Sequence, residues 1–125
     1  MRFEDLEIRV LRWAEDKDLL HSENADKQFL KFIEEVFEFK TEMDDFIHYL
    51  ELSKHTKIYD IFSGNRTAEN MKLEMGDIFV TLIILCKQIG IDPVECLEMA
   101  YRKISKRTGK TINGQFIKSE DLEQE

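Results

Sequence analysis

Proline is almost absent from this sequence, and glycine is scarce. The 125 residues include one proline and five glycines, so few positions force a turn or stop a helix. Cysteine is equally rare: Cys86 and Cys96 form no CxxC pair and no other zinc-binding spacing. Both cysteines lie in apolar patterns of helical period, which predicts reduced thiols in the core.

The main apolar run of the sequence is too short to span a bilayer. It covers Ile78–Cys86, whereas a membrane-spanning helix needs ~20 residues. The N-terminal stretch MRFEDLEIRVLRWAEDKDLL is charged and amphipathic, unlike a signal peptide. We therefore expect a soluble, cytoplasmic protein that has no membrane partner.

Acidic residues outnumber basic ones, and their distribution is uneven. Lys and Arg total 18 and Asp and Glu total 26, a formal charge of −8, so we expect no general binding of nucleic acid. Between Met99 and Ser119, however, there is no acid, and the basic residues are Arg102, Lys103, Lys106, Arg107, Lys110 and Lys118. This basic stretch suits phosphate binding. The alternative is a solvated basic face that balances an acidic body.

Apolar residues recur at helical spacing and predict an all-α domain over residues 1–118. We expect helices over about residues 2–16, 25–52 and 68–89, and a fourth that begins at Pro93, in a four-helix, bundle-like arrangement. Gly90 is the expected C-cap of the third helix, and Asp92 is the expected N-cap of the fourth. Residues 53–67 are predicted to form a connection, with a turn at Ser63-Gly64-Asn65. A short helix that contains Ile58, Tyr59, Ile61 and Phe62 is an alternative for part of it.

The third predicted helix and the end of the chain carry two further signals. The third helix is apolar on too many faces for a small monomer, which predicts an oligomer that buries its outer side. Asn113-Gly114 is typical of a type I′ turn, so residues 111–118 are expected to form a small hairpin or an extended tail. Residues 119–125 are expected to be a frayed acidic tail.

Two pairs of carboxylates lie beside apolar helix faces. Glu35 and Glu38 are three residues apart, as are Glu74 and Asp77, and this spacing puts each pair on one helix face. Carboxylates are seldom buried unless they are paired or bind a metal. Oxygen ligands without His or Cys favour Mg²⁺, with Mn²⁺ as an alternative. For residues 31–39 alone, the alternative is a solvated acidic flank.

These motifs give the sequence a family likeness. It resembles the MazG-like nucleotide pyrophosphohydrolases of the all-α nucleoside triphosphate pyrophosphatase superfamily. The matching motifs are Trp13-Ala14, Gln28-x-x-Lys31-x-x-Glu34-Glu35-x-x-Glu38, Glu74-Met75-Gly76-Asp77, and Lys103-x-x-Lys106-Arg107-Thr108-Gly109-Lys110 followed by Asn113-Gly114. The resemblance covers the chain from Trp13 to Lys118. The sequence departs from the family pattern in the long connection between the acidic motifs and at Phe37, where a small residue is usual.

The resemblance implies a fold, a reaction and a set of residue roles. The implied fold is an all-α MazG-like oligomer, either a homodimer or a dimer of dimers. The implied reaction is the Mg²⁺-dependent hydrolysis of (d)NTP to (d)NMP and pyrophosphate. The implied metal ligands are Glu35, Glu38, Glu74 and Asp77, and the implied catalytic acids are Glu34, Glu35 and Glu38. Candidate substrate-binding residues are Gln28, Lys31, Lys103, Arg107, Lys110 and Asn113.

Two other classes of protein are alternatives to this hydrolase. A carboxylate-bridged di-iron bundle needs Glu-x-x-His on two helices. Here the third residue after Glu35 is Glu38, and the motif most similar to Glu-x-x-His is Asp45-x-x-His48. The other alternative is a non-catalytic dimerisation or regulatory module of the same fold. Retention of four carboxylates near a core argues against that module, because unpaired carboxylates there cost stability.

Overall fold

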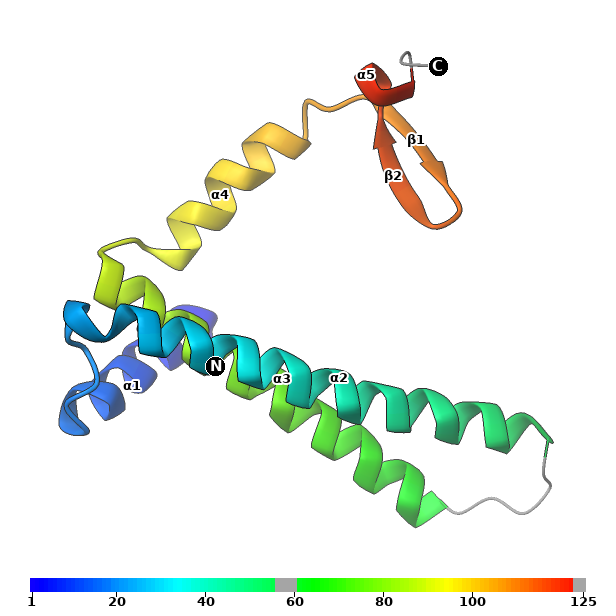
Figure 1. The fold of residues 1–125 in the computed structure, drawn as a ribbon, viewed down its shortest axis with the longest axis horizontal. Coiled ribbons are helices and arrows are strands. Elements are labelled where there is room, and N and C mark those ends of the chain that lie inside the picture. Colours follow the sequence, from blue (N-terminus) through cyan, green and yellow to red (C-terminus); the bar gives the residue numbers. More distant parts are fainter. Residues whose placement is uncertain (56–60, 123–125) are drawn as a thin grey trace. The chain divides into compact units, whose positions relative to one another are not determined.

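The protein is mostly helical and divides into two compact units. The structure, a computed structural model, describes residues 1–55 and 61–122. The units comprise Met1–Ile91 and Asp92–Glu125 (Figure 1). The predicted helical character is confirmed, whereas the MazG-like bundle and the single domain over residues 1–118 stay predictions. Within the described ranges, no helix has the length and apolar character that crossing a membrane requires.

The N-terminal unit is built around one long apolar helix. Its elements are α1 (Phe3–Asp16), the 3₁₀ helix η1 (Ser22–Asn24), α2 (Ala25–His55) and α3 (Ile61–Ile89). Helix α3 lies alongside α2 and also packs against α1 (Figure 1). Among the residues described, the buried apolar side chains are Ala14 of α1 and Ile83, Ile84 and Cys86 of α3. The run Ile78–Cys86 therefore supplies most of the core. Cys96 is exposed, so the prediction that both cysteines lie in the core is wrong for this residue.

Helix α3 begins earlier than its sequence predicted. Residues 61–67 are helical, so the predicted connection is wrong there, as is the turn at Ser63-Gly64-Asn65. Residues 56–60 lie outside the described part of the chain. A glycine inside a helix costs about 1 kcal/mol relative to alanine, and the pairing of α3 with α2, which continues to His55, outweighs this local preference.

The C-terminal end of α3 is fixed by a Schellman motif. Gly90 adopts the left-handed conformation, with φ of 79°. The amide of Ile91 donates to the carbonyl of Cys86 at 2.9 Å, and the amide of Gly90 donates to that of Lys87 at 3.3 Å. These two bonds define the motif and satisfy carbonyls that the helix leaves open. The prediction that α3 stops at Gly90 is confirmed.

The buried side-chain amide of Gln88 connects the segment that follows α1 to α3. Gln88 is 6% exposed, and its Nε2 donates to the carbonyl of Leu19 at 2.7 Å. Leu19 follows α1, which ends at Asp16. The bond therefore fixes the segment that leads from α1 into η1 and α2 against the last turn of α3.

The C-terminal unit begins with a capped helix. Helix α4 spans Pro93–Ile104, and the side chain of Asp92 accepts a hydrogen bond from the amide of Val94 at 3.1 Å. Proline in the first turn removes no helical hydrogen bond and has a suitable φ. The predicted start of this helix is confirmed.

A two-stranded hairpin and a short helix complete the C-terminal unit. Strands β1 (Gly109–Ile112) and β2 (Gln115–Lys118) pair antiparallel. Asn113 and Gly114 have φ of 52° and 77°, as a type I′ turn requires, so the predicted hairpin is confirmed. Helix α5 (Ser119–Leu122) contacts both strands. The predicted fraying is therefore wrong for its four residues.

Two glycines, one inside α3 and one just after it, should respond in opposite directions to alanine. Gly90→Ala should lower the free energy of unfolding by about 1 kcal/mol, because a Cβ is strained at positive φ. Gly76→Ala, inside the helix and with open space around the new Cβ, should raise it by up to about 1 kcal/mol. Urea unfolding measures both changes. A destabilising Gly76→Ala, or a neutral Gly90→Ala, would contradict these backbone conformations.

Candidate metal centre

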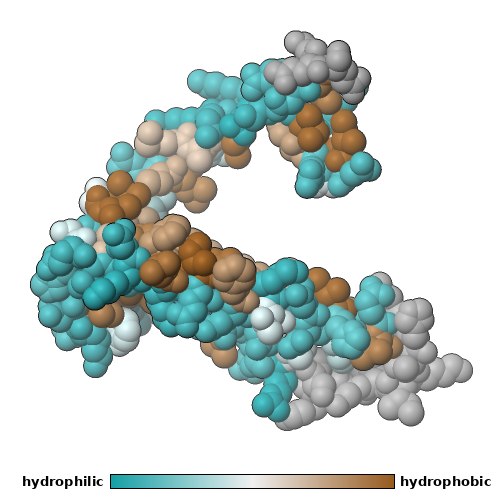
Figure 2. All heavy atoms as spheres, in the orientation of Figure 1, coloured by the Kyte–Doolittle hydropathy of each residue, from teal (hydrophilic) through white to brown (hydrophobic). Residues whose placement is uncertain are grey.

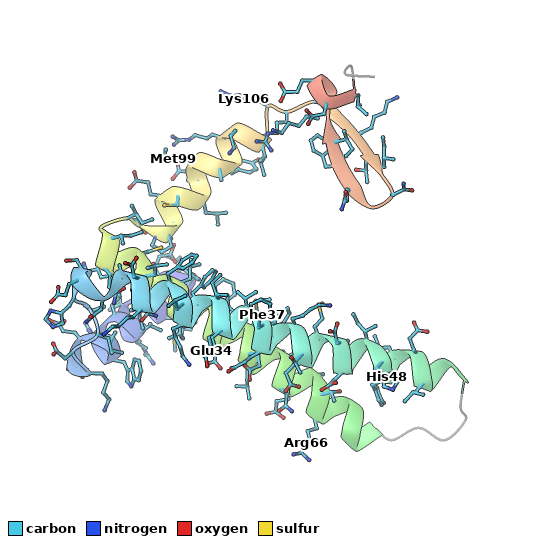
Figure 3. All side chains as sticks on the ribbon, viewed as in Figure 1. Glu34, Phe37, His48, Arg66, Met99 and Lys106 are labelled. Carbon is cyan, nitrogen blue, oxygen red and sulfur yellow. The ribbon has the colours of Figure 1, made fainter. Side chains whose placement is uncertain are left out.

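Three carboxylates from two helices converge in the N-terminal unit. One oxygen from each of Glu35, Glu74 and Asp77 lies within 4.8 Å of the other two. Glu35 comes from α2, and Glu74 and Asp77 lie one turn apart on α3; Glu34, labelled in Figure 3, marks this part of α2. Glu35 is 6% exposed, Glu74 is half-buried and Asp77 is exposed. The cluster therefore reaches from the helix interface to solvent.

Glu38 joins this cluster through its side-chain hydrogen bonds. In its protonated form it donates to the carboxylates of Glu35 and Glu74. The bond to Glu35 and the negative charge of that residue raise the pKa of Glu38 above its usual range. The four predicted ligands thus lie together, although Glu38 is outside the tight group of three. Carboxylates this close repel one another when all are charged, so they retain a proton more readily.

Glu74 is perturbed by burial and by a residue that the sequence analysis did not select. Partial burial is the main cause of its raised pKa, followed by the charges of Asp77 and Glu35, and Glu42 adds a smaller repulsion. Glu42 lies four residues after Glu38 on α2, and this spacing keeps both near one face of the helix. The continued acidic spacing was the signal that could have revealed it.

The donor set of the cluster fits a hard divalent cation. The Oε2 atoms of Glu35 and Glu74 are buried and have no hydrogen-bond partner in the described structure. A buried carboxylate oxygen without a partner is costly, and coordination of a cation would satisfy it. Because every donor is a carboxylate oxygen, the residues suit Mg²⁺ or Mn²⁺ better than zinc or copper.

Lys31 neutralises part of the negative charge. Its Nζ lies 3.0 Å from Oε1 of Glu35 and 3.6 Å from Oε2 of Glu34. The bond to Glu35 raises the pKa of Lys31, so its ammonium group stays charged. A residue predicted to contact substrate is therefore bound to a predicted metal ligand. Glu34, a predicted catalytic acid, contacts this lysine at the exposed edge of the cluster.

Gln28 connects α2 with α3 near the cluster. Its Nε2 donates to the carbonyl of Thr81 at 3.3 Å. Gln28 lies on α2 before Glu35, and Thr81 lies on α3 after Asp77, so this bond ties the two helices together beside the carboxylates. A direct role of Gln28 in binding substrate stays a prediction.

The basic candidates belong to the C-terminal unit. Lys103 lies near the end of α4, Lys110 on β1 and Asn113 in the hairpin turn, and Arg107 follows α4. Asn113 has a structural role there, because its positive φ helps to form the turn. The substrate-binding roles of these four residues stay predictions.

A hollow at the base of the hairpin contains one of these cations. It has a volume of about 420 Å³ and is lined by Arg107, Thr108, Lys118, Ser119 and Glu120. The hydroxyl groups of Thr108 and Ser119 bond each other at 2.8 Å. Arg107 and the two hydroxyl groups are suitable partners for phosphate oxygens, whereas Nζ of Lys118 lies 3.8 Å from a carboxylate oxygen of Glu120.

No family model, no curated protein and no solved structure matches the chain. The likeness to MazG-like hydrolases therefore rests on the motifs of the sequence, and the metal site rests on the convergence of its carboxylates.

Glu38→Gln should stabilise the metal-free protein at neutral pH. Raised pKa values of Glu38 and Glu74 mean that the folded state binds more protons than the unfolded state. Stability should then fall as pH rises from about 4.5 through the raised values, and stay low above them. Glutamine removes one charge and can still donate a hydrogen bond, so the stability of the variant should depend less on pH than that of wild type.

The control for this prediction is Asp45→Asn on the same helix. This change alters the net charge equally, about 10 Å further along the axis of α2, and should leave the pH dependence unchanged. The stabilities of wild type, Glu38→Gln and Asp45→Asn are measured by thermal unfolding between pH 4 and 8 in the presence of a chelator. Equal pH slopes in wild type and Glu38→Gln would show that the carboxylates do not repel one another.

Proposed function

We propose that the protein is a Mg²⁺-dependent nucleoside triphosphate pyrophosphohydrolase that converts (d)NTP to (d)NMP and pyrophosphate. The observation that carries this proposal is the convergence of Glu35, Glu74 and Asp77 within 4.8 Å. These residues come from the two acidic motifs on which the likeness to MazG-like enzymes depends. Buried oxygens without partners on Glu35 and Glu74 support a cation as the missing partner.

The residues of the cluster have distinct roles in this proposal. Glu35, Glu74 and Asp77 hold the cation, and Glu38 completes the set. When bound, Mg²⁺ supplies Lewis-acid polarisation of phosphoryl oxygens. Glu38 lies outside the tight group of three and is therefore the carboxylate of the set that the cation would engage least. Glu38 is thus suited to take a proton from the attacking water, and Glu34 supports it from the exposed edge of the site.

The C-terminal unit carries the cations that the sequence likeness assigns to phosphate binding. Arg107 and Lys118 line one hollow, and Lys103 and Lys110 lie close to Arg107 in the sequence. Arginine and lysine bind phosphate oxygens through charge-assisted hydrogen bonds. Following the sequence likeness, we propose that Lys103, Arg107 and Lys110 bind phosphate groups, with Lys118 as an additional contact that the hollow suggests.

Hydrolysis should depend on the carboxylates of the cluster. Asp77→Asn keeps the size of an exposed side chain but removes a charged ligand, so it should lower kcat/KM by about 100-fold or more. Asp45→Asn, the matched control on α2, should hydrolyse at the rate of wild type. The assay incubates each protein with Mg²⁺ and a panel of canonical and modified nucleotides and measures the pyrophosphate released.

The same assay separates the enzyme from its non-catalytic alternative. A regulatory or dimerisation module would release no pyrophosphate from any nucleotide, and calorimetry would detect neither Mg²⁺ nor nucleotide binding. Turnover by Asp77→Asn at the wild-type rate would reject the proposed ligand set.

We also propose that the protein is a homo-oligomer. Large apolar side chains are exposed on the first half of α2, where Phe29, Leu30 and Phe37 are 50%, 66% and 68% exposed. Figure 2 shows this apolar surface over the first half of the helix. Leu30 and Phe37 lie two turns apart on one face, which a second copy would remove from water.

Replacement of both residues by serine should weaken the proposed assembly. The double variant Leu30→Ser/Phe37→Ser should sediment as a monomer, because each side chain contributes about 1–3 kcal/mol when buried. Lys40→Ser on the same helix is the control. Sedimentation velocity over a concentration series measures the mass, and circular dichroism checks the helix content. A wild-type chain that stays monomeric throughout the series would overturn the proposal.

A further inference from the structure

Lys31 occupies an unusual position for a lysine that is expected to bind substrate. Its ammonium lies 3.0 Å from Oε1 of Glu35, the most buried carboxylate of the cluster. The other oxygen of that carboxylate, Oε2, is buried and has no hydrogen-bond partner. Lys31 is thus the cation that neutralises Glu35, and it satisfies only half of the carboxylate.

The surroundings of Lys31 allow its ammonium to leave. The side chain of Lys31 is 50% exposed, whereas that of Glu35 is 8% exposed, so rotation of the lysine towards water uncovers the carboxylate without unpacking the helices. The pair also has the less favourable order on a helix, with the base four residues before the acid. Its second contact, to Oε2 of Glu34 at 3.6 Å, lies at the exposed edge and gives the departing ammonium a partner.

A divalent cation and this ammonium would compete for one carboxylate. Both carry positive charge, and their repulsion at short distance in a half-buried site is substantial. A divalent cation also attracts Glu74 and Asp77, which Lys31 does not bond in the described structure. The cation therefore gains more from the cluster than the lysine does.

We infer that Lys31 is the resident counter-cation of the metal-free site and that a divalent cation displaces its ammonium from Glu35. The displaced ammonium then lies at the open edge of the cluster, where it binds a phosphate group of the nucleotide. This inference rests on the proposed function, and it makes Lys31 a positioning residue that couples metal binding to substrate binding.

Removal of the competing charge should strengthen metal binding in the absence of nucleotide. Lys31→Met should bind Mn²⁺ or Mg²⁺ about tenfold more tightly than wild type, measured by titration calorimetry. Lys40→Met is the matched control, because Lys40 pairs with Asp44 four residues later on the same helix, at 2.7 Å. This control should bind metal as wild type does.

A second variant keeps the test valid if the methionine protein does not fold without metal. Lys31→Gln removes the charge but retains an amide that can donate to Glu35, so this buried carboxylate keeps a partner. It should also bind the metal more tightly than wild type. With metal saturating, both variants should bind a non-hydrolysable nucleotide analogue about tenfold more weakly, because a phosphate contact is lost.

Amine reactivity reports directly on the displacement. Acylation of the wild-type protein, followed by peptide mass spectrometry, should show that Lys31 reacts faster after Mg²⁺ is added and slower again after the nucleotide analogue is added. Lys40, which is exposed on the same helix, should react at one rate throughout. The reaction is compared at a single pH, with chelator or with metal.

The outcomes separate this inference from the proposed function. Wild type that binds no divalent cation overturns both. Wild type that binds the cation while Lys31 keeps a constant reactivity, and while Lys31→Met and Lys31→Gln bind it no more tightly, overturns the counter-cation role and leaves the hydrolase proposal intact.

Discussion

Pairing of α2 with α3 brings together residues that are distant in the sequence. Gln28 bonds the backbone at Thr81, and Glu35 meets Glu74. Between these two contacts the chain advances by 35 − 28 = 7 residues on α2 and retreats by 81 − 74 = 7 residues on α3, which is two helical turns on each. The helices are therefore antiparallel in one register. A slip of one residue would rotate Glu74 by about 100° away from Glu35.

This register has an electrostatic cost that the fold tolerates. Partial burial, followed by the charges of Asp77 and Glu35, raises the pKa of Glu74, and two carboxylate oxygens of the cluster are buried without partners. Lys31 offsets part of the repulsion. An arrangement that lowers the stability of the metal-free protein is typical of a site that a ligand completes, because functional sites accept local strain that cores avoid.

Local patterns were sufficient to predict most helix ends and both acidic pairs. Gly90, Asp92 and Asn113-Gly114 act within a few residues, so their roles could be read directly. The start of α3 could not be predicted in this way, since Ser63-Gly64-Asn65 favours a turn locally and only the pairing with α2 makes it helical. Glu42 continues the acidic spacing of α2, but its effect on Glu74 acts across the helix interface, so the spacing alone did not single it out.

The sequence by itself determined the helical class, the hairpin turn and which acids share a face within each helix. These features follow from spacing and backbone preference over one or two turns. Tertiary structure decided which faces meet: it set Glu35 against Glu74 and Asp77, and it paired Gln28 with a carbonyl of α3. Such contacts depend on the register between two helices, which no local pattern specifies.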